Sequence, residues 1–142
     1  MNRLTAALAL SAALTTALAP SSCAQAASLE LEISGLTRAE GQVLVALFDR
    51  AESWMKRPLQ ARKLAPAPDG SLRLRFDDLP EGEYAYTLLH DLNGNGRMDF
   101  NLIGIPTEAY AFSNNAGRFG APKFEEARFT LAGDMQQRIS LR

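Results

Sequence analysis

Most of this chain alternates between apolar and polar residues with a period of two, the pattern of β-strands that bury one face. Alternation of this kind runs through residues 28–34, 71–78, 126–131 and 135–142. Residues 42–48 and 83–90 are apolar on nearly both faces, which places them in the middle of their sheets, and 59–65 is a weaker strand. About seven short strands separated by turn signals predict one all-β domain, an antiparallel β-sandwich of the immunoglobulin or prealbumin type.

The first residues of the chain have a different character from the rest. A short positive start is followed by an uncharged run of Leu, Ala and Thr, and small residues close this run at Ala24 and Ala26. This is the layout of a secretory signal peptide, so we expect 1–26 to be removed and 27–142 to form the exported domain. The run is too short and too rich in Ala for a typical membrane helix, although an N-terminal anchor remains an alternative.

Cys23 offers a second way of processing the N-terminus. A lipoprotein signal would place a lipidated cysteine here, but Pro20 stands where such signals usually carry Leu. Cleavage after Ala26 instead discards Cys23, the single cysteine of the chain, and leaves a domain without disulfides. We therefore expect a periplasmic or secreted protein with no membrane span in its mature part.

Residues 91–123 interrupt the alternation and are rich in Gly, Pro and Asn. Loops of this length in a compact domain tend to be functional or disordered. We predict a folded excursion over one end or edge of the sandwich, with Phe112 as a buried anchor. Asn114 and Asn115 tolerate left-handed backbone and are expected to turn the chain back. The apolar residues expected to anchor this excursion are Phe100, Leu102, Ile103, Ile105, Tyr110, Phe112 and Phe119.

The excursion opens with the sequence DLNGNGRMD, which resembles the start of a calcium-binding loop. Position 12 of the EF-hand pattern would need a Glu but is Leu102, and a strand rather than a helix comes before the loop. The segment is therefore not an EF-hand, but it can still be a weak calcium loop of an extracellular type. The alternative is a plain Asn-Gly turn whose side chains bond nearby N–H groups. The candidate metal ligands are Asp91, Asn93, Asn95, Arg97 through its backbone carbonyl, Asp99 and Glu108.

Catalytic patterns are not found in the sequence. The only histidine is His90, whose neighbour Asp91 points to the other face of its strand, so the two do not form a ready dyad. A buried His bonded to backbone is the expected role. The balance of 15 basic and 16 acidic residues gives no reason to expect a nucleic-acid partner. We therefore predict a protein that is not an enzyme.

The segment 90–131 resembles a family of small exported bacterial proteins known only as a domain of unknown function, number twenty-one forty-one. Ala111 stands where the family usually carries Gly. A shorter stretch, LPEGEYAYTLLHD at 79–91, is similar to a strand of prealbumin-like and carboxypeptidase-regulatory-like sandwiches. The family resemblance implies an exported single β-domain and no particular activity. It is carried by Asp91, Asn93, Gly94, Asn95, Gly96, Asp99, Asn101, Gly104, Pro106, Glu108, Tyr110, Phe112 to Asn115, Pro122, Phe124, Glu125 and Phe129.

These observations lead to one functional expectation with two alternatives. We expect a non-enzymatic exported β-sandwich in which 91–123 contacts an envelope or extracellular ligand and is a candidate for binding calcium. The first alternative is a hydrolase that acts on envelope polymers through carboxylates of the same loop. The second is a purely structural module in which the excursion only covers a sheet edge.

Overall fold

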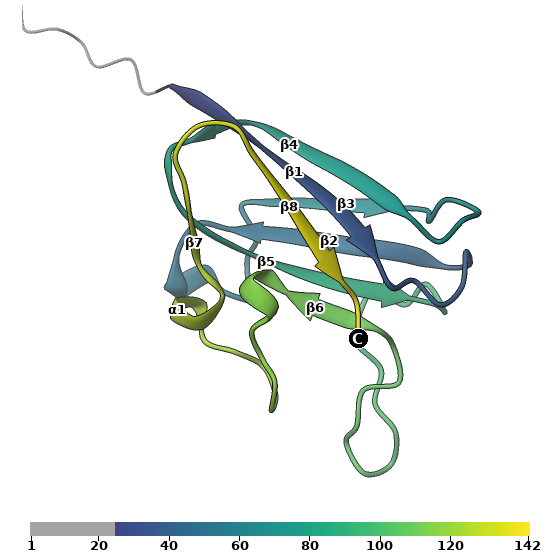
Figure 1. Cartoon of the computed structure of the whole chain (residues 1–142). Coiled ribbons are helices and arrows are strands. Elements are labelled where there is room, and N and C mark those ends of the chain that lie inside the picture. The colour runs from purple at the N-terminus through teal and green to yellow at the C-terminus, as the bar shows by residue number, and fades with distance from the viewer. Residues whose placement is uncertain (1–24) are drawn as a thin grey trace, which may run out of the picture.

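The computed structural model describes residues 25–142, which form two β-sheets that face each other across an apolar core (Figure 1). The expected signal peptide lies outside the described residues up to position 24, and Ala26 already begins the first strand. The all-β sandwich predicted from the alternation is confirmed. The strands are β1 (Ala26–Ser34), β2 (Gln42–Phe48), β3 (Gln60–Leu64), β4 (Leu72–Pro80), β5 (Gly82–Asp91), β6 (Tyr110–Phe112), β7 (Phe129–Leu131) and β8 (Met135–Ser140).

The smaller sheet has the strand order β4-β1-β8 and contains the one departure from an antiparallel arrangement in the described part of the chain. β1 pairs antiparallel with β4 but parallel with β8. A parallel neighbour needs a long connection, and nearly the whole domain lies between β1 and β8. In this register Ile139 pairs with Ile33, so the apolar faces of both strands point into the core. The predicted β-sandwich is antiparallel at its other strand pairs in the described residues, and the β1–β8 pair departs from that arrangement.

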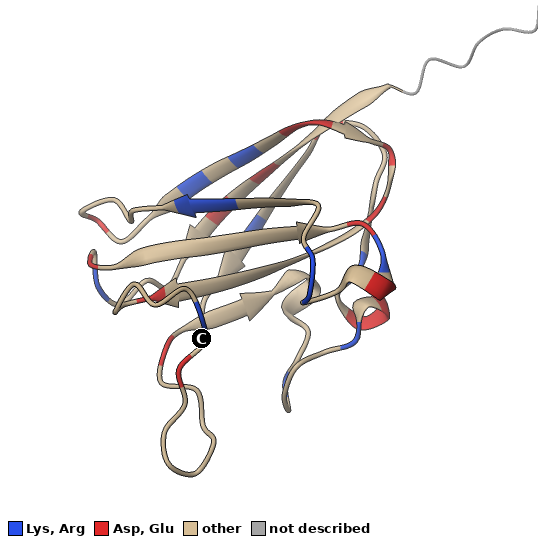
Figure 2. Ribbon diagram, turned by 180° about the vertical axis from the view of Figure 1, so that it is seen from behind, with Lys and Arg blue, Asp and Glu red and all other residues tan. Residues whose placement is uncertain are grey.

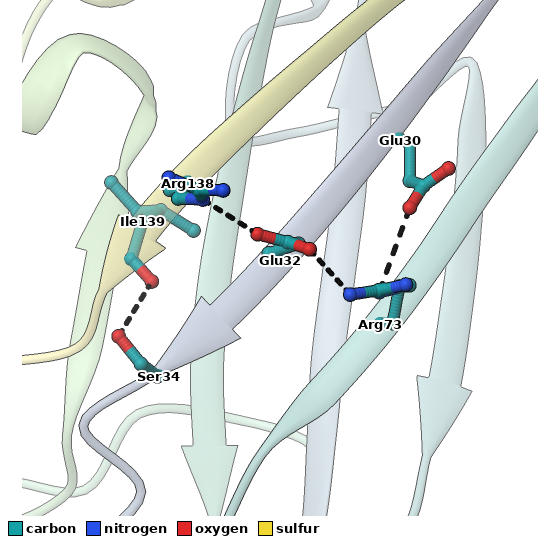
Figure 3. Close-up of polar contacts among 6 residues, drawn as sticks. All are labelled: Glu30, Glu32, Ser34, Arg73, Arg138 and Ile139. Atoms are coloured by element: carbon teal, nitrogen blue, oxygen red, sulfur yellow. Dashed lines mark hydrogen bonds and ion pairs between the residues drawn. The ribbon is translucent and has the colours of Figure 1, made fainter.

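The solvent face of the smaller sheet is covered by ion pairs (Figure 3). Glu32 on β1 lies between Arg73 on β4 and Arg138 on β8, at 2.5 and 2.7 Å. The hydrogen bond that Arg138 donates to the Glu32 carboxylate, together with Arg73, lowers the pKa of this carboxyl. Cross-strand pairs of opposite charge suit a face that stays in water.

The larger sheet has the order β3-β2-β5-β6, and β7 pairs with the early part of β5. β2 and β5 are therefore central, as their two-sided apolar character predicts. His90 on β5 faces the core with Tyr86 and Leu88, and its Nε2 lies 2.8 Å from the carbonyl oxygen of Glu40. The predicted role of a buried histidine bonded to backbone is confirmed.

The other face of the larger sheet carries a second, smaller apolar cluster. Its members are Phe48, Trp54, Ala85, Phe112, Phe124 and Ala127. Three short helices lie beside the strands, and their bounds are η1 (Ala51–Ser53), η2 (Ser113–Asn115) and α1 (Phe124–Ala127).

Helix α1 replaces the first part of the strand that the sequence predicted at 126–131. The carboxylate of Glu126 accepts the N–H of Lys123 at 2.7 Å, which closes the first helical turn. Phe124 and Ala127, three residues apart, both enter the second cluster. Only Phe129–Leu131 remains a strand. Among residues 25–142, no helix is long and apolar enough to cross a bilayer.

Candidate functional site

The loop that follows β5 is organised around the carboxylate of Asp91, which is completely buried. Positive φ angles at Gly94 (74°) and Gly96 (77°) curl the backbone so that its N–H groups point inward. Oδ1 of Asp91 accepts the N–H of Gly94 at 2.8 Å and that of Asn95 at 3.1 Å. Oδ2 accepts the N–H of Gly96 at 2.8 Å and the Nε2–H of Gln42 at 2.7 Å. Burial alone would raise the pKa of Asp91, but these four donors together lower it.

A second layer of side-chain contacts surrounds this buried carboxylate. The side-chain amides of Asn93 and Asn95 donate to the carboxylate of Asp99, at 2.5 Å and 2.9 Å. Their carbonyl oxygens accept the backbone N–H groups of Asn95 and Arg97, each at 3.0 Å. These are the local bonds of Asx turns. The structure thus brings Asp91, Asn93, Asn95 and Asp99 into one loop, with Arg97 exposed at its surface.

Glu108 lies at the far end of this arrangement and is buried. Its Oε1 accepts the N–H of Leu92 at 2.9 Å, and its Oε2 accepts the N–H of Asp99 at 3.3 Å. The Glu108 side chain therefore ties the start of the Asp91 loop to Asp99. Asp99 and Glu108, where the chain leaves this loop and later returns toward β6, are called here the neck.

The described residues do not form the donor set of a ready metal site. Within 25–142, no three His, Cys, Asp or Glu side chains are grouped in a way that could hold a metal ion. Both oxygens of Asp91 already accept N–H donors, so a cation bound there would have to replace these bonds. The arrangement is that of a hydrogen-bonded turn. Calcium binding by this loop stays a prediction.

Beyond the neck, residues 99–107 form a short hairpin, called here the apolar hairpin. Phe100 and Pro106 form an antiparallel bridge, and the N–H of Asn101 donates to the carbonyl of Ile105 at 2.9 Å. Oδ1 of Asn101 in turn accepts the N–H groups of Ile103 and Ile105, at 3.0 and 2.9 Å. The backbone of the turn is therefore well bonded within itself.

The side chains of the apolar hairpin point into solvent, contrary to the prediction that they anchor the excursion. The relative exposures are 59% for Phe100, 107% for Leu102, 79% for Ile103 and 54% for Ile105. A tight turn that projects from the domain has no opposite surface for them to pack against. Only Phe112, and in part Tyr110, serve as the predicted anchors.

A second loop, 116–122, follows η2 and carries Phe119, which is fully exposed. Asn114 and Asn115 turn the chain with φ angles of 59° and 51°, as predicted. Figure 1 shows that this loop and the apolar hairpin both project on the β6 side of the larger sheet, away from the start of β1. The two loops thus place exposed apolar side chains on one side of the molecule.

The pattern of residues across this whole region matches a known family. The family model described as "Uncharacterized protein conserved in bacteria (DUF2141)" matches residues 31–140. The chain belongs to this family. Comparisons with curated proteins and with solved structures gave no match. The match to DUF2141 confirms the resemblance seen in the sequence, and its range includes the Asp91 loop, the apolar hairpin and the second loop.

The roles of two residues of this DUF2141 site were not predicted from the sequence, although Asn101 belongs to the family pattern. Gln42 reaches Asp91 because the two are paired across β2 and β5, which no local pattern reveals. Asn101 organises the hairpin turn, and the sequence did carry a signal for it. Asn101 is followed after two residues by Gly104, and no charge occurs from Phe100 to Thr107. Asn101 and Gly104 indicate a turn, and a turn has no neighbouring strand to pack against. Apolar residues between them are therefore expected to be exposed.

Proposed function

We propose that this DUF2141 domain is an exported, non-enzymatic binding module that contacts an envelope or extracellular ligand through its β6 side. The observation that carries the proposal is that two structured loops on one side of the molecule hold five apolar side chains in water, four on the apolar hairpin and one on the second loop: Phe100, Leu102, Ile103, Ile105 and Phe119. Export rests on the signal-peptide layout of residues 1–26.

Exposed apolar side chains in a group are costly to keep in water. Burying apolar surface is worth about 25 cal/mol per Å², so a ligand that covers these side chains gains affinity from each. Single exposed apolar residues are common on proteins, but a group on structured loops marks an interaction site. The internal bonds of the apolar hairpin also reduce the conformational entropy that binding would cost.

The carboxyl groups of the surface hollow beside η1 and of the Asp91 loop give little support for the alternative of a hydrolase. A hollow of about 580 Å³ lies beside η1 and includes Asp49 and Glu52. The hydrogen bond from Arg50 lowers the pKa of Asp49, whereas a general acid for glycoside hydrolysis needs a raised pKa. The carboxylates of Asp91 and Glu108 are occupied by backbone N–H donors and are buried.

Retention on isolated cell envelopes tests the proposed function. The protein in its exported form is mixed with an envelope fraction and sedimented. The double variant Leu102→Ser/Ile103→Ser should lose most of the retained protein, because it removes the two most exposed side chains of the apolar hairpin. The control Met55→Ser/Leu59→Ser changes side chains of similar type that are exposed by 48% and 46% outside the hairpin, and it should be retained like the parent. Equal retention of all three proteins would contradict the proposal.

A further inference from the structure

We propose that the ligand of the apolar hairpin is the surface of a lipid bilayer, into which Leu102 and Ile103 insert. This inference rests on the proposed function and names the ligand of the same site. Three independent features of the hairpin support a bilayer rather than a groove on a protein partner: the distribution of its exposed side chains, the bonding of its backbone and the position of its charges.

The exposed side chains lie all around the tip rather than on one face. Leu102 and Ile103 are neighbours in the chain, yet both are almost fully exposed. Phe100 and Ile105, on the two arms, are exposed by more than half. A groove covers one face of a hairpin and leaves the others in water. A bilayer surrounds an inserted tip, so it removes all four side chains from water together.

Most N–H groups of the tip already meet the main requirement of a hydrocarbon environment, and that of Leu102 is the exception among the described residues of the turn. Groups that enter lipid must have their hydrogen bonds satisfied internally, because no water is present to bond them. The N–H groups of Asn101, Ile103, Gly104 and Ile105 all donate within the turn, and Pro106 has none to donate. Two of these bonds are accepted by Oδ1 of Asn101, so the carbonyl oxygen of this polar side chain is itself engaged.

The charges of the hairpin are placed where the headgroups would lie. No charged residue occurs from Phe100 to Thr107, and Asp99 and Glu108 stand at the neck. Figure 2 shows the same division, with an uncoloured loop beyond its acidic neck. At about 3.3 Å per residue, two or three residues of each arm reach roughly 7–10 Å beyond the neck. This matches the depth of about 5–10 Å at which interfacial segments insert.

The charges near the neck also determine which lipids are favoured. The carboxylates of Asp99 and Glu108 are matched in number by the exposed Arg97 and Arg118 of the two loops, so this side has no excess charge to attract anionic lipids and insertion should depend on apolar contact. We therefore expect binding to zwitterionic bilayers, with little sensitivity to salt. The second loop, which carries the exposed Phe119, projects on the same side of the molecule (Figure 1), so its ring is placed to add an aromatic contact at the interface.

Protein-free vesicles provide the test. The exported protein is sedimented with vesicles of pure phosphatidylcholine and with vesicles that contain one fifth phosphatidylglycerol. Binding to phosphatidylcholine is expected, and Leu102→Ser/Ile103→Ser should lower the partition coefficient at least about tenfold. Met55→Ser/Leu59→Ser should bind like the parent. Parent and variants are first compared by thermal melting, so that a folding defect is not read as lost binding.

A second variant separates insertion of a bonded turn from simple apolar adhesion. Asn101→Ala makes the tip more apolar but leaves the N–H groups of Ile103 and Ile105 without their acceptor. Insertion into hydrocarbon therefore predicts weaker binding of Asn101→Ala, by several-fold. Binding equal to or above that of the parent would overturn this part of the proposal.

Other occupants give different outcomes. Retention on envelopes through the hairpin, with no binding to vesicles of either composition, would indicate a protein partner; it would overturn the lipid inference and leave the proposed function standing. A dimer in solution that Leu102→Ser/Ile103→Ser dissociates would indicate a second copy of the chain and would also overturn it. If the parent protein binds neither envelopes nor vesicles, both proposals are contradicted.

Discussion

The indole N–H of Trp54 donates a buried hydrogen bond of 2.8 Å to the carbonyl oxygen of Pro122. This bond joins the segment after β2 to the end of the second loop, and the Trp54 ring packs edge-on against Phe48 and Phe124. The base of the second loop is thus tied to the sandwich while Phe119 at its tip remains in solvent. Such a contact at the base of a loop holds its backbone in place even though the apolar side chain at its tip is exposed.

Trp54→Phe should destabilise the domain through this bond. Phe retains an aromatic ring in the cluster but cannot donate, so the carbonyl of Pro122 would be left without a partner in a buried position. The expected loss of unfolding free energy is about 1–3 kcal/mol, measured by denaturant unfolding. A loss below about 0.5 kcal/mol would show that water replaces the indole as donor.

Phe112→Ala should be more damaging, because Phe112 is the anchor of the excursion. Its ring is buried in the second cluster with Trp54 and Tyr110 beside it. Truncation of a buried Phe costs about 3–5 kcal/mol. The control Phe119→Ala removes the same ring from a fully exposed position and should change the stability by no more than about 0.5 kcal/mol. Similar effects of both variants would contradict the assignment of Phe112 as the anchor.

The strands that bury one or two faces could be predicted from the sequence because alternation records burial directly. The predicted strand 42–48 coincides with β2, for example. β6 has only three residues, too few to show a period, and it was missed. The sequence of α1 predicts a strand because Ala127 and Phe129 alternate across what is in fact a helix end. The parallel pairing of β8 depends on long-range register, which a local pattern does not contain.

The candidate site was predictable in part for a similar reason. The oxygens of Asp91, Asn93, Asn95 and Asp99 come together because the two Gly residues between them curl the chain, which is a local effect. What these oxygens bind depends on their donors, and Gln42 comes from another strand. The prediction that the apolar residues of the hairpin are buried anchors was wrong, because apolar character leads to burial only where another surface lies opposite.

Processing of the N-terminus remains a separate prediction. Cleavage after Ala26 gives an exported protein that starts at Ala27, the buried residue that pairs with Leu79 on β4. Mass spectrometry of the protein recovered from the periplasm or the medium should show this mass. A lipid-modified protein that starts at Cys23 would contradict the prediction.

The stability contributed by Asp91 should depend on pH. The four hydrogen bonds lower the pKa of its carboxyl in the folded state, so its contribution is present above the unfolded pKa of about 4 and is lost as the pH falls through the folded value. Asp91→Asn cannot hold a charge at any pH. The difference in unfolding free energy between parent and variant should therefore be largest near pH 7 and shrink as the pH falls below about 4. A difference that is constant across this range would show that charge plays no part.

Calcium provides the last test of the Asp91 loop. If the ion binds the folded state, a free concentration one hundred times the dissociation constant raises the unfolding free energy by about 2.7 kcal/mol. Dissociation constants of about 0.1–1 mM are typical of extracellular modules, so the parent should be melted in calcium of tens of millimolar and in chelator. Asp91→Asn should abolish any calcium response, whereas the control Asp69→Asn, which alters an exposed turn closed by Ser71, should retain it.

The hydrogen bonds in the structure add a second expectation: without metal, Asp91→Asn should be less stable than the parent, because four donors lose a charged acceptor. Equal melting temperatures of the parent in calcium and in chelator, together with that loss in the variant, would leave DLNGNGRMD as a turn that supports the apolar hairpin and binds no ion.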